Sequence, residues 1–119
     1  MTTPRKVLSR FRLEAMSNLR SKVTGVENTI IWVSSGEFSG SNIQHGPKIK
    51  VALGNKITDE TLANAISIQL TDPPQVLGTL PGEIKKQAVE FVSKNRDTLL
   101  HYWNKEIDTA EMLERLEKA

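Results

Sequence analysis

The apolar residues at the start of the chain recur at the three- and four-residue spacing of a helix face. This stripe consists of Leu8, Phe11, Ala15, Leu19 and Val23. Thr3-Pro4 precedes it as a hydroxyl N-cap followed by proline at the first helical position, and Gly25 follows it where a helix stop is expected. The pattern predicts a helix over residues 4–23, with arginine and lysine on its polar side.

The middle of the chain has the patterns of β-strands. Residues 29–33 are β-branched or aromatic and carry apolar side chains on both faces, which predicts a central strand covered on both sides. Residues 48–53 and 66–70 alternate with period two, and Val76-Leu77 adds a short edge. The turn-rich residues 34–46 allow the first two strands to form a hairpin. Residues 57–64 fit either a short helix or an extended segment, and we expect a loop there.

The last third of the chain predicts two helices. An apolar face runs from Ile84 to Trp103, after Leu80-Pro81, and indicates one long helix. Asp108 and Glu111 form a capping box that opens a short final helix. The expected fold is therefore α+β, with a small antiparallel sheet of three to four strands, a long helix, a basic N-terminal helix and a short C-terminal helix. We expect the two longer helices to cover opposite faces of the sheet.

Composition places the chain among soluble globular domains. It has 119 residues, of which 38% are hydrophobic and 25% charged, so we expect a single domain over 1–119, with the basic helix in 1–24 and the sheet and other helices in 25–119. The absence of cysteine excludes disulfides, thiolate nucleophiles and cysteine-based zinc sites. The longest apolar run, Ile30-Ile31-Trp32-Val33, is too short to cross a membrane, and we expect a cytoplasmic protein. A mitochondrial transit peptide is the alternative for the arginine-rich start.

The charges are divided unevenly along the chain. Residues 1–56 have a net charge of +6 and residues 57–119 a net charge of −4. This asymmetry favours an anionic partner for the first half, either nucleic acid or an acidic protein surface. The candidate contact residues are Arg5, Arg10, Arg12, Arg20, Lys22, Lys48 and Lys50. The alternative is that these side chains form an ordinary solvated surface.

A different hypothesis makes the protein an enzyme. His45 on a loop, with Lys48 and Lys50 beyond it, could act as the acid/base and phosphate-holding groups of a small ribonuclease or toxin. The alternative is that His45 bonds to loop backbone while the lysines keep a strand edge soluble. The second histidine, His101, is far away in the sequence, so the chain predicts no metal site. No phosphate-binding loop motif is present, and we expect no cofactor.

Three motifs carry a family resemblance. His45-x-Pro47 precedes a strand that ends at Gly54, a further strand and turn lead to Leu80-Pro81, and a helix closes with Asn95-Arg96-Asp97-x-Leu99-Leu100-x-x-Trp103. Over about residues 45–116 the chain resembles a family of short bacterial proteins, the 4160 domain of unknown function. The resemblance implies a component of mobile or toxin–antitoxin-like gene pairs. Lys48 and Lys50 stand where that family usually has further histidines, which argues against a histidine cluster here.

The sequence thus favours a small non-enzymatic bacterial or phage accessory protein that binds nucleic acid or an acidic protein surface through its basic first half. A phage inhibitor of a host defence complex belongs to this class, because it would gain affinity by resembling or masking a nucleic-acid interface. A small ribonuclease is the alternative. A homodimer, in which the basic half of one copy meets the acidic half of another, is a third hypothesis.

Overall fold

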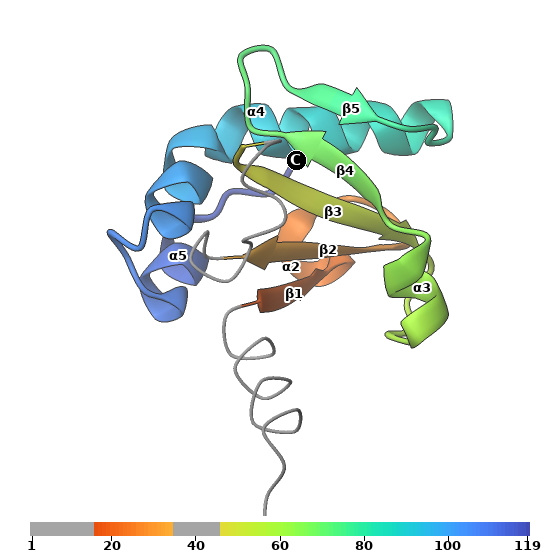
Figure 1. Cartoon of the computed structure of the whole chain (residues 1–119), viewed down its shortest axis with the longest axis horizontal. Coiled ribbons are helices and arrows are strands. Elements are labelled where there is room, and N and C mark those ends of the chain that lie inside the picture. The colour runs from red at the N-terminus through yellow and green to blue at the C-terminus, as the bar shows by residue number, and fades with distance from the viewer. Residues whose placement is uncertain (1–15, 35–45) are drawn as a thin grey trace, which may run out of the picture.

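The computed structural model describes residues 16–34 and 46–119, which form a five-stranded antiparallel sheet and four helices. The strands follow one another in the sheet in the order of the sequence, as in a meander (Figure 1). Their bounds are β1 Met16–Arg20, β2 Thr29–Ser34, β3 Lys48–Leu53, β4 Ile66–Gln69 and β5 Gln75–Leu77. β3 therefore lies in the middle of the sheet, with two strands on each side.

The strand register separates the side chains into two faces. One cross-strand row joins Leu19, Ile31 and Val51, all of which belong to the main hydrophobic core. Successive side chains of a strand point to opposite faces. Ile30, Trp32 and Ala52 consequently face the other side, where they form a second and smaller cluster. Both faces of β2 are buried, as its apolar pattern predicts.

The long helix α4, Gly82–Trp103, covers the face of the main core and lies behind the sheet in Figure 1. Its buried positions Ala88, Phe91, Val92 and Leu99 follow the helical repeat, and each is fully buried. Burial of these side chains against Ile31, Val33, Ile49 and Ile68 supplies the main hydrophobic stabilisation of the fold.

The other helices lie at the ends of the sheet and of α4. They are α2 Ser21–Thr24, α3 Asp59–Ala63 and α5 Thr109–Arg115. Gly25 ends α2 with a left-handed φ of +76°, a conformation that glycine adopts without steric cost. The Asp108 side chain accepts a hydrogen bond from Glu111 N at 2.8 Å and caps α5.

The final residues of the chain are bound to α4 through one buried side chain. Asn95 is 2% exposed, and its Nδ2 donates to Glu117 O at 2.7 Å while its Oδ1 accepts from Glu117 N at 2.8 Å. Ala119 N donates to Thr24 O at 2.8 Å, next to Gly25. These bonds connect the C-terminal segment to both α4 and α2.

The structure confirms the expected α+β class with its antiparallel sheet, long helix and short C-terminal helix. The hairpin of residues 29–33 and 48–53 is present as the antiparallel pair β2 and β3. Asp72-Pro73-Pro74 lies after the end of β4. The short edge strand expected at Val76-Leu77 is present as β5. Within the described residues, no helix is long and apolar enough to cross a membrane.

The main correction concerns the predicted N-terminal helix. Residues 16–20 of the predicted range 4–23 are β1, which pairs with β2, and among the described residues of this segment the helix is confined to Ser21–Thr24. Leu19 fits both a helix stripe and a strand, and pairing of β1 with β2 decides for the strand. The sheet therefore has five strands instead of three to four, and it begins before residue 25. Residues 1–15, and with them the proposed cover of the second face, lie outside the described part.

A second correction concerns residues 57–64, where we expected a loop. Asp59–Ala63 form the helix α3. Thr58 is its N-cap, and its side chain accepts a hydrogen bond from Thr61 N at 3.1 Å while Thr58 N donates to Thr61 Oγ1 at 2.8 Å. This reciprocal capping stabilises a short helix that has no buried residue.

Candidate functional site

The charged residues of the sheet all lie on one face. The five strands contain no aspartate or glutamate, and their only charged residues are Arg20 on β1 and Lys48 and Lys50 on β3. Arg20 is opposite Ile30 and Lys50 is opposite Trp32, so both face the side of the smaller cluster. Lys48 is two residues from Lys50 on the same strand and shares its face. We refer to Arg20, Lys48 and Lys50 as the cationic face.

Polar side chains without charge surround the two lysines. The cross-strand row of Lys50 runs Asn18, Trp32, Lys50, Ser67, Leu77, from β1 to β5. Lys48 lies opposite Gln69, which lies opposite Gln75 on β5. Hydroxyl and amide groups can both donate and accept hydrogen bonds. The face thus holds the partly exposed Lys50 and the buried Lys48 among side chains suited to a polar, anionic ligand.

Lys48 is held in an unusual environment for a cation. It is only 6% exposed, and burial followed by the nearby charge of Lys50 lowers the pKa of its ammonium group below the ordinary value. Among the residues that the structure describes, no carboxylate forms an ion pair with Lys48, Lys50 or Arg20. Two neighbouring cations with no acidic partner in this part of the chain raise the local positive potential, and a bound anion would relieve their repulsion.

Arg20 is positioned by the end of the neighbouring hairpin. Its Nη1 donates a hydrogen bond to Asn55 O at 2.6 Å, in the segment that follows β3. This bond uses one of the five donors of the guanidinium group. The side chain lies at the end of the sheet where β3 stops, whereas Lys48 lies at the end where β3 begins.

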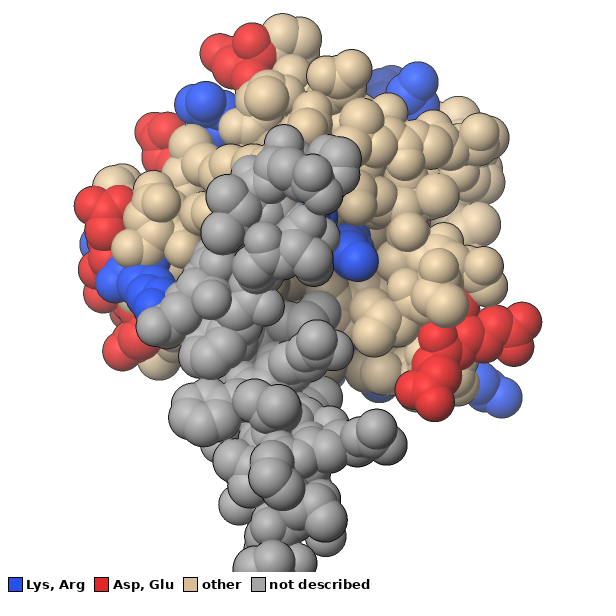
Figure 2. All heavy atoms as spheres, in the orientation of Figure 1, with Lys and Arg blue, Asp and Glu red and all other residues tan. Residues whose placement is uncertain are grey.

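The acidic side chains of the described residues that Figure 2 shows lie away from the middle of the sheet. Figure 2 views the sheet from the side opposite α4, and the carboxylates visible there lie toward the rim of the molecule. One acidic group is on α3, with Asp59 and Glu60 in its first turn, and another is on α5 and the segments beside it. The acidic second half of the sequence thus does not neutralise the lysines of β3 within the described residues.

The structure brings together only part of the predicted contact set. Arg20, Lys48 and Lys50 share one face, whereas Lys22 lies on α2, beyond the end of β1. Arg5, Arg10 and Arg12 lie outside the described residues. The sequence did not single out Asn18, Ser67, Gln69 and Gln75 as neighbours of the lysines, because only the strand register places them there.

The groups required by the enzyme hypothesis are not assembled in the described part. His45 lies outside it. His101 is on α4, where its Nδ1 is 3.1 Å from Oε1 of Glu106, an interaction that holds the imidazole at the helix end. The described residues contain no group of three or more side chains that could hold a metal ion.

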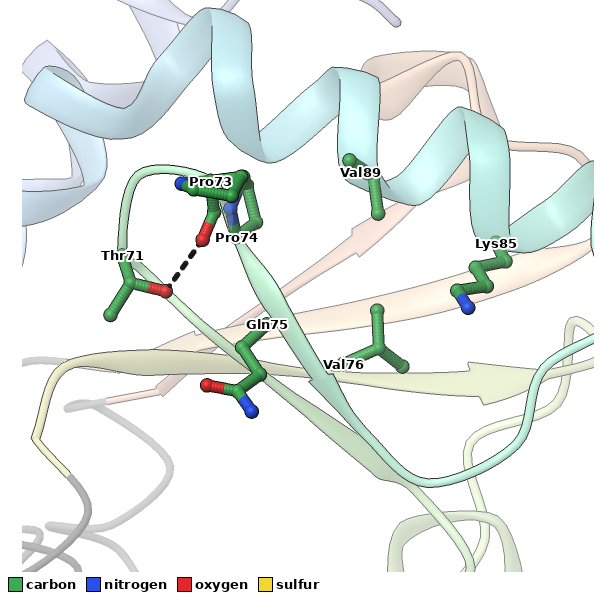
Figure 3. Close-up of a pocket in the computed structure, with 7 residues that line it drawn as sticks. All are labelled: Thr71, Pro73, Pro74, Gln75, Val76, Lys85 and Val89. Atoms are coloured by element: carbon green, nitrogen blue, oxygen red, sulfur yellow. Dashed lines mark hydrogen bonds between the residues drawn. The ribbon is translucent and has the colours of Figure 1, made fainter.

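A separate hollow of about 440 Å³ lies between β5 and α4 (Figure 3). Val76 reaches into it from the strand, and Lys85 and Val89 reach into it from the helix. The Thr71 hydroxyl at its rim donates to Pro73 O at 2.8 Å. The lining offers apolar surface and one ammonium group, and it contains no nucleophile paired with a base.

Comparisons of the chain with protein-family models, with curated proteins and with solved structures found no match. The family resemblance therefore stays a prediction. In the structure its helix motif has identifiable structural roles: Asn95 binds the C-terminal segment, Arg96 Nε donates to Leu70 O at 2.9 Å, and Leu99 is fully buried.

Proposed function

We propose that this protein binds nucleic acid without catalysing a reaction, and that the cationic face contacts the phosphates together with Arg5, Arg10 and Arg12. One observation carries the proposal: every charged residue of the five strands is a cation, and all three face the same side. Lysine and arginine are the side chains that bind phosphate groups, by charge and by directed hydrogen bonds.

The contrast with α4 supports this interpretation. The exposed positions of α4 mix both signs, as in Glu83, Lys85, Lys86 and Glu90, which is typical of a solvated helix surface. A purely solvated sheet face would be expected to show the same mixture. Lys48 is also buried, and burial lowers the pKa of its ammonium group, so its charge costs desolvation energy; an ionisable group kept at such a cost favours a ligand-binding role.

The other hypotheses have less support from the described residues. An acidic protein surface would satisfy the same cations, and it is the alternative outcome of the test below. The ribonuclease hypothesis depends on His45, which lies outside the described part, and the shared face of Lys48 and Lys50 is compatible with either hypothesis. The toxin–antitoxin role stays a prediction from the family resemblance, and the phage role stays a prediction from the basic first half of the sequence.

The test is fluorescence anisotropy of fluorescein-labelled DNA and RNA, titrated with the full chain at several salt concentrations. Binding should weaken as salt rises, because each phosphate contact releases a counterion. The double variant Lys48→Gln/Lys50→Gln should bind at least tenfold more weakly. The control is Lys85→Gln/Lys86→Gln on α4, which removes the same charge from the opposite side of the sheet and should leave affinity within about twofold.

Substitution of Arg5, Arg10 and Arg12 by glutamine tests the N-terminal contribution while retaining β1, whose Leu19 is part of the core. We expect a further loss of affinity. Equal affinity of the two double-lysine variants would contradict the proposal, as would no binding of either nucleic acid by the unmodified protein. In that last case, binding of poly-glutamate with the same lysine dependence would favour an acidic protein surface.

A further inference from the structure

We infer that the nucleic acid bound by the cationic face is single-stranded DNA or RNA, an inference that rests on the proposed function. It follows from the shape of the face and from the arrangement of its charges. Both lysines are on β3, the middle strand, so the ligand must reach the centre of the sheet and not merely its edge.

The width of the sheet prevents it from entering a groove of duplex DNA. Five strands spaced about 4.8 Å apart extend over about 19 Å. The major groove of B-form DNA is about 12 Å wide and admits a helix or a two-stranded ribbon. Lys48 and Lys50 are flanked by two strands on each side, so they cannot be inserted into the groove. A duplex could contact them only through its outer backbone.

The charge pattern also does not suit a straight duplex backbone. The three cations occupy three different cross-strand rows: Arg20 with Ile30, Lys50 with Trp32, and Lys48 with Gln69. A duplex lying across the strands would follow one row and so meet one cation. A duplex lying along β3 would meet both lysines and then extend past the end of the strand toward α3, which carries Asp59 and Glu60. Duplex DNA is too stiff to turn aside over this distance.

A single strand can follow the bent line of cations. Residues two apart on a strand are about 7 Å from each other, so Lys48 and Lys50 can contact neighbouring parts of one flexible backbone. Arg20 is two strands away, about 10 Å across the sheet, and provides a third contact. A chain that passes Lys48, Lys50 and Arg20 changes direction at Lys50, which a single strand does at little cost.

The polar neighbours of the lysines fit exposed bases. Asn18 and Gln75 are exposed, and Ser67 is half-buried in the same row as Lys50. Their amide and hydroxyl groups can donate to and accept from the base edges that a duplex hides in base pairs. Leu77, 41% exposed beside Ser67, provides apolar surface for a base. Trp32 lies between Asn18 and Lys50 in the same row and is 5% exposed.

The test compares three fluorescein-labelled ligands of equal length and sequence: single-stranded DNA, single-stranded RNA and blunt duplex DNA. We expect each single strand to bind the full chain at least tenfold more tightly than the duplex. With three phosphate contacts from the cationic face and three from Arg5, Arg10 and Arg12, the slope of log K against log salt for a single strand should be about −4. Each lysine-to-glutamine substitution should make that slope shallower by about 0.7.

The double variant Asn18→Ala/Gln75→Ala separates base contacts from charge. It should weaken single-strand binding about three- to tenfold and leave the salt slope unchanged, whereas Lys85→Gln/Lys86→Gln should change neither. Circular dichroism and thermal melting confirm that each variant is folded.

The outcomes separate this inference from the proposed function. Duplex binding as tight as single-strand binding, with the same dependence on Lys48 and Lys50, would overturn the inference and leave the proposed function standing. No binding of any of the three ligands, or equal binding by the two double-lysine variants, would overturn both. A preference for RNA over DNA strands would support the inference and add recognition of the 2′-hydroxyl group.

Discussion

Replacing Asn95 with alanine should release the C-terminal segment from α4 and destabilise the whole domain. Asn95 is 2% exposed and makes three hydrogen bonds to main-chain atoms. Its Nδ2 donates to Phe91 O at 2.8 Å and to Glu117 O at 2.7 Å, and its Oδ1 accepts from Glu117 N at 2.8 Å. An alanine removes all three bonds and leaves two polar groups of Glu117 without their protein partner.

The magnitude follows from these bonds. A hydrogen bond within a protein contributes about 1 kcal/mol net, and a partly buried polar group that loses its partner costs more. Three bonds therefore predict a loss of about 2–4 kcal/mol in the free energy of unfolding. For a domain of this size, a loss in that range lowers the melting temperature by about 10 °C. Asn64→Ala is the matched control, because that side chain is exposed and makes one hydrogen bond, to Glu60 O at 3.0 Å.

Urea unfolding followed by circular dichroism measures the loss. Asn64→Ala should cost less than about 0.5 kcal/mol, as surface substitutions usually do. Deletion of residues 117–119 should also destabilise the protein, and the deletion combined with Asn95→Ala should cost less than the sum of the two, because both remove the same bonds. A loss below about 0.5 kcal/mol for Asn95→Ala, or full additivity with the deletion, would refute the role assigned to this side chain.

Two further predictions concern Lys48 and Asp108. Because burial lowers the pKa of Lys48, the unfolded chain holds its proton over a pH range in which the folded chain has lost it, so this group makes stability rise with pH just below 10.5. Lys48→Met should be more stable than the original protein at pH 7 and lack this rise, which urea unfolding measures. Lower stability of the variant at pH 7 would show instead that the folded protein stabilises the ammonium group. Asp108→Ala should cost about 1 kcal/mol by removing the cap of α5. Asp108→Asn should retain most of this stability in the same assay, and an equal loss in both variants would contradict the hydrogen-bond explanation.

The Lys48 prediction connects stability with binding. The same substitution that removes a costly buried charge also removes a proposed phosphate contact. Lys48→Met should therefore gain stability and lose affinity for nucleic acid, a trade-off common at functional sites. A variant that gains stability and retains full affinity would place the phosphate contacts elsewhere, on Lys50, Arg20 or the N-terminal arginines.

Much of the fold could be predicted from local patterns. The alternation of Ile49, Val51 and Leu53 with polar or small residues identified β3, and the apolar face from Ile84 to Trp103 identified α4. Asp108 marked the start of α5. These signals are reliable because burial on one side of a strand or helix imposes a period on the sequence, and a cap requires particular side chains at one position.

The candidate site could be predicted only in part. Lys48 and Lys50 share a face because they are two residues apart on one strand, so the sequence was sufficient for this pair. Arg20 was assigned to the same set of contacts, but on a helix. Its place on the sheet depends on the pairing of β1 with β2. The sequence predicted a strand for β2 but a helix for the residues of β1, so this pairing was not expected.

By itself, the sequence determined the α+β class, the positions of the long helix and of the inner strands, and the excess of positive charge in the first half. Only the tertiary structure decided that residues 16–20 are a strand, because Leu19 fits either period and its burial against Ile31 settles the choice. The tertiary structure also decided that Arg20, Lys48 and Lys50 share one face, since strand register is fixed by packing across the sheet and not by any local preference.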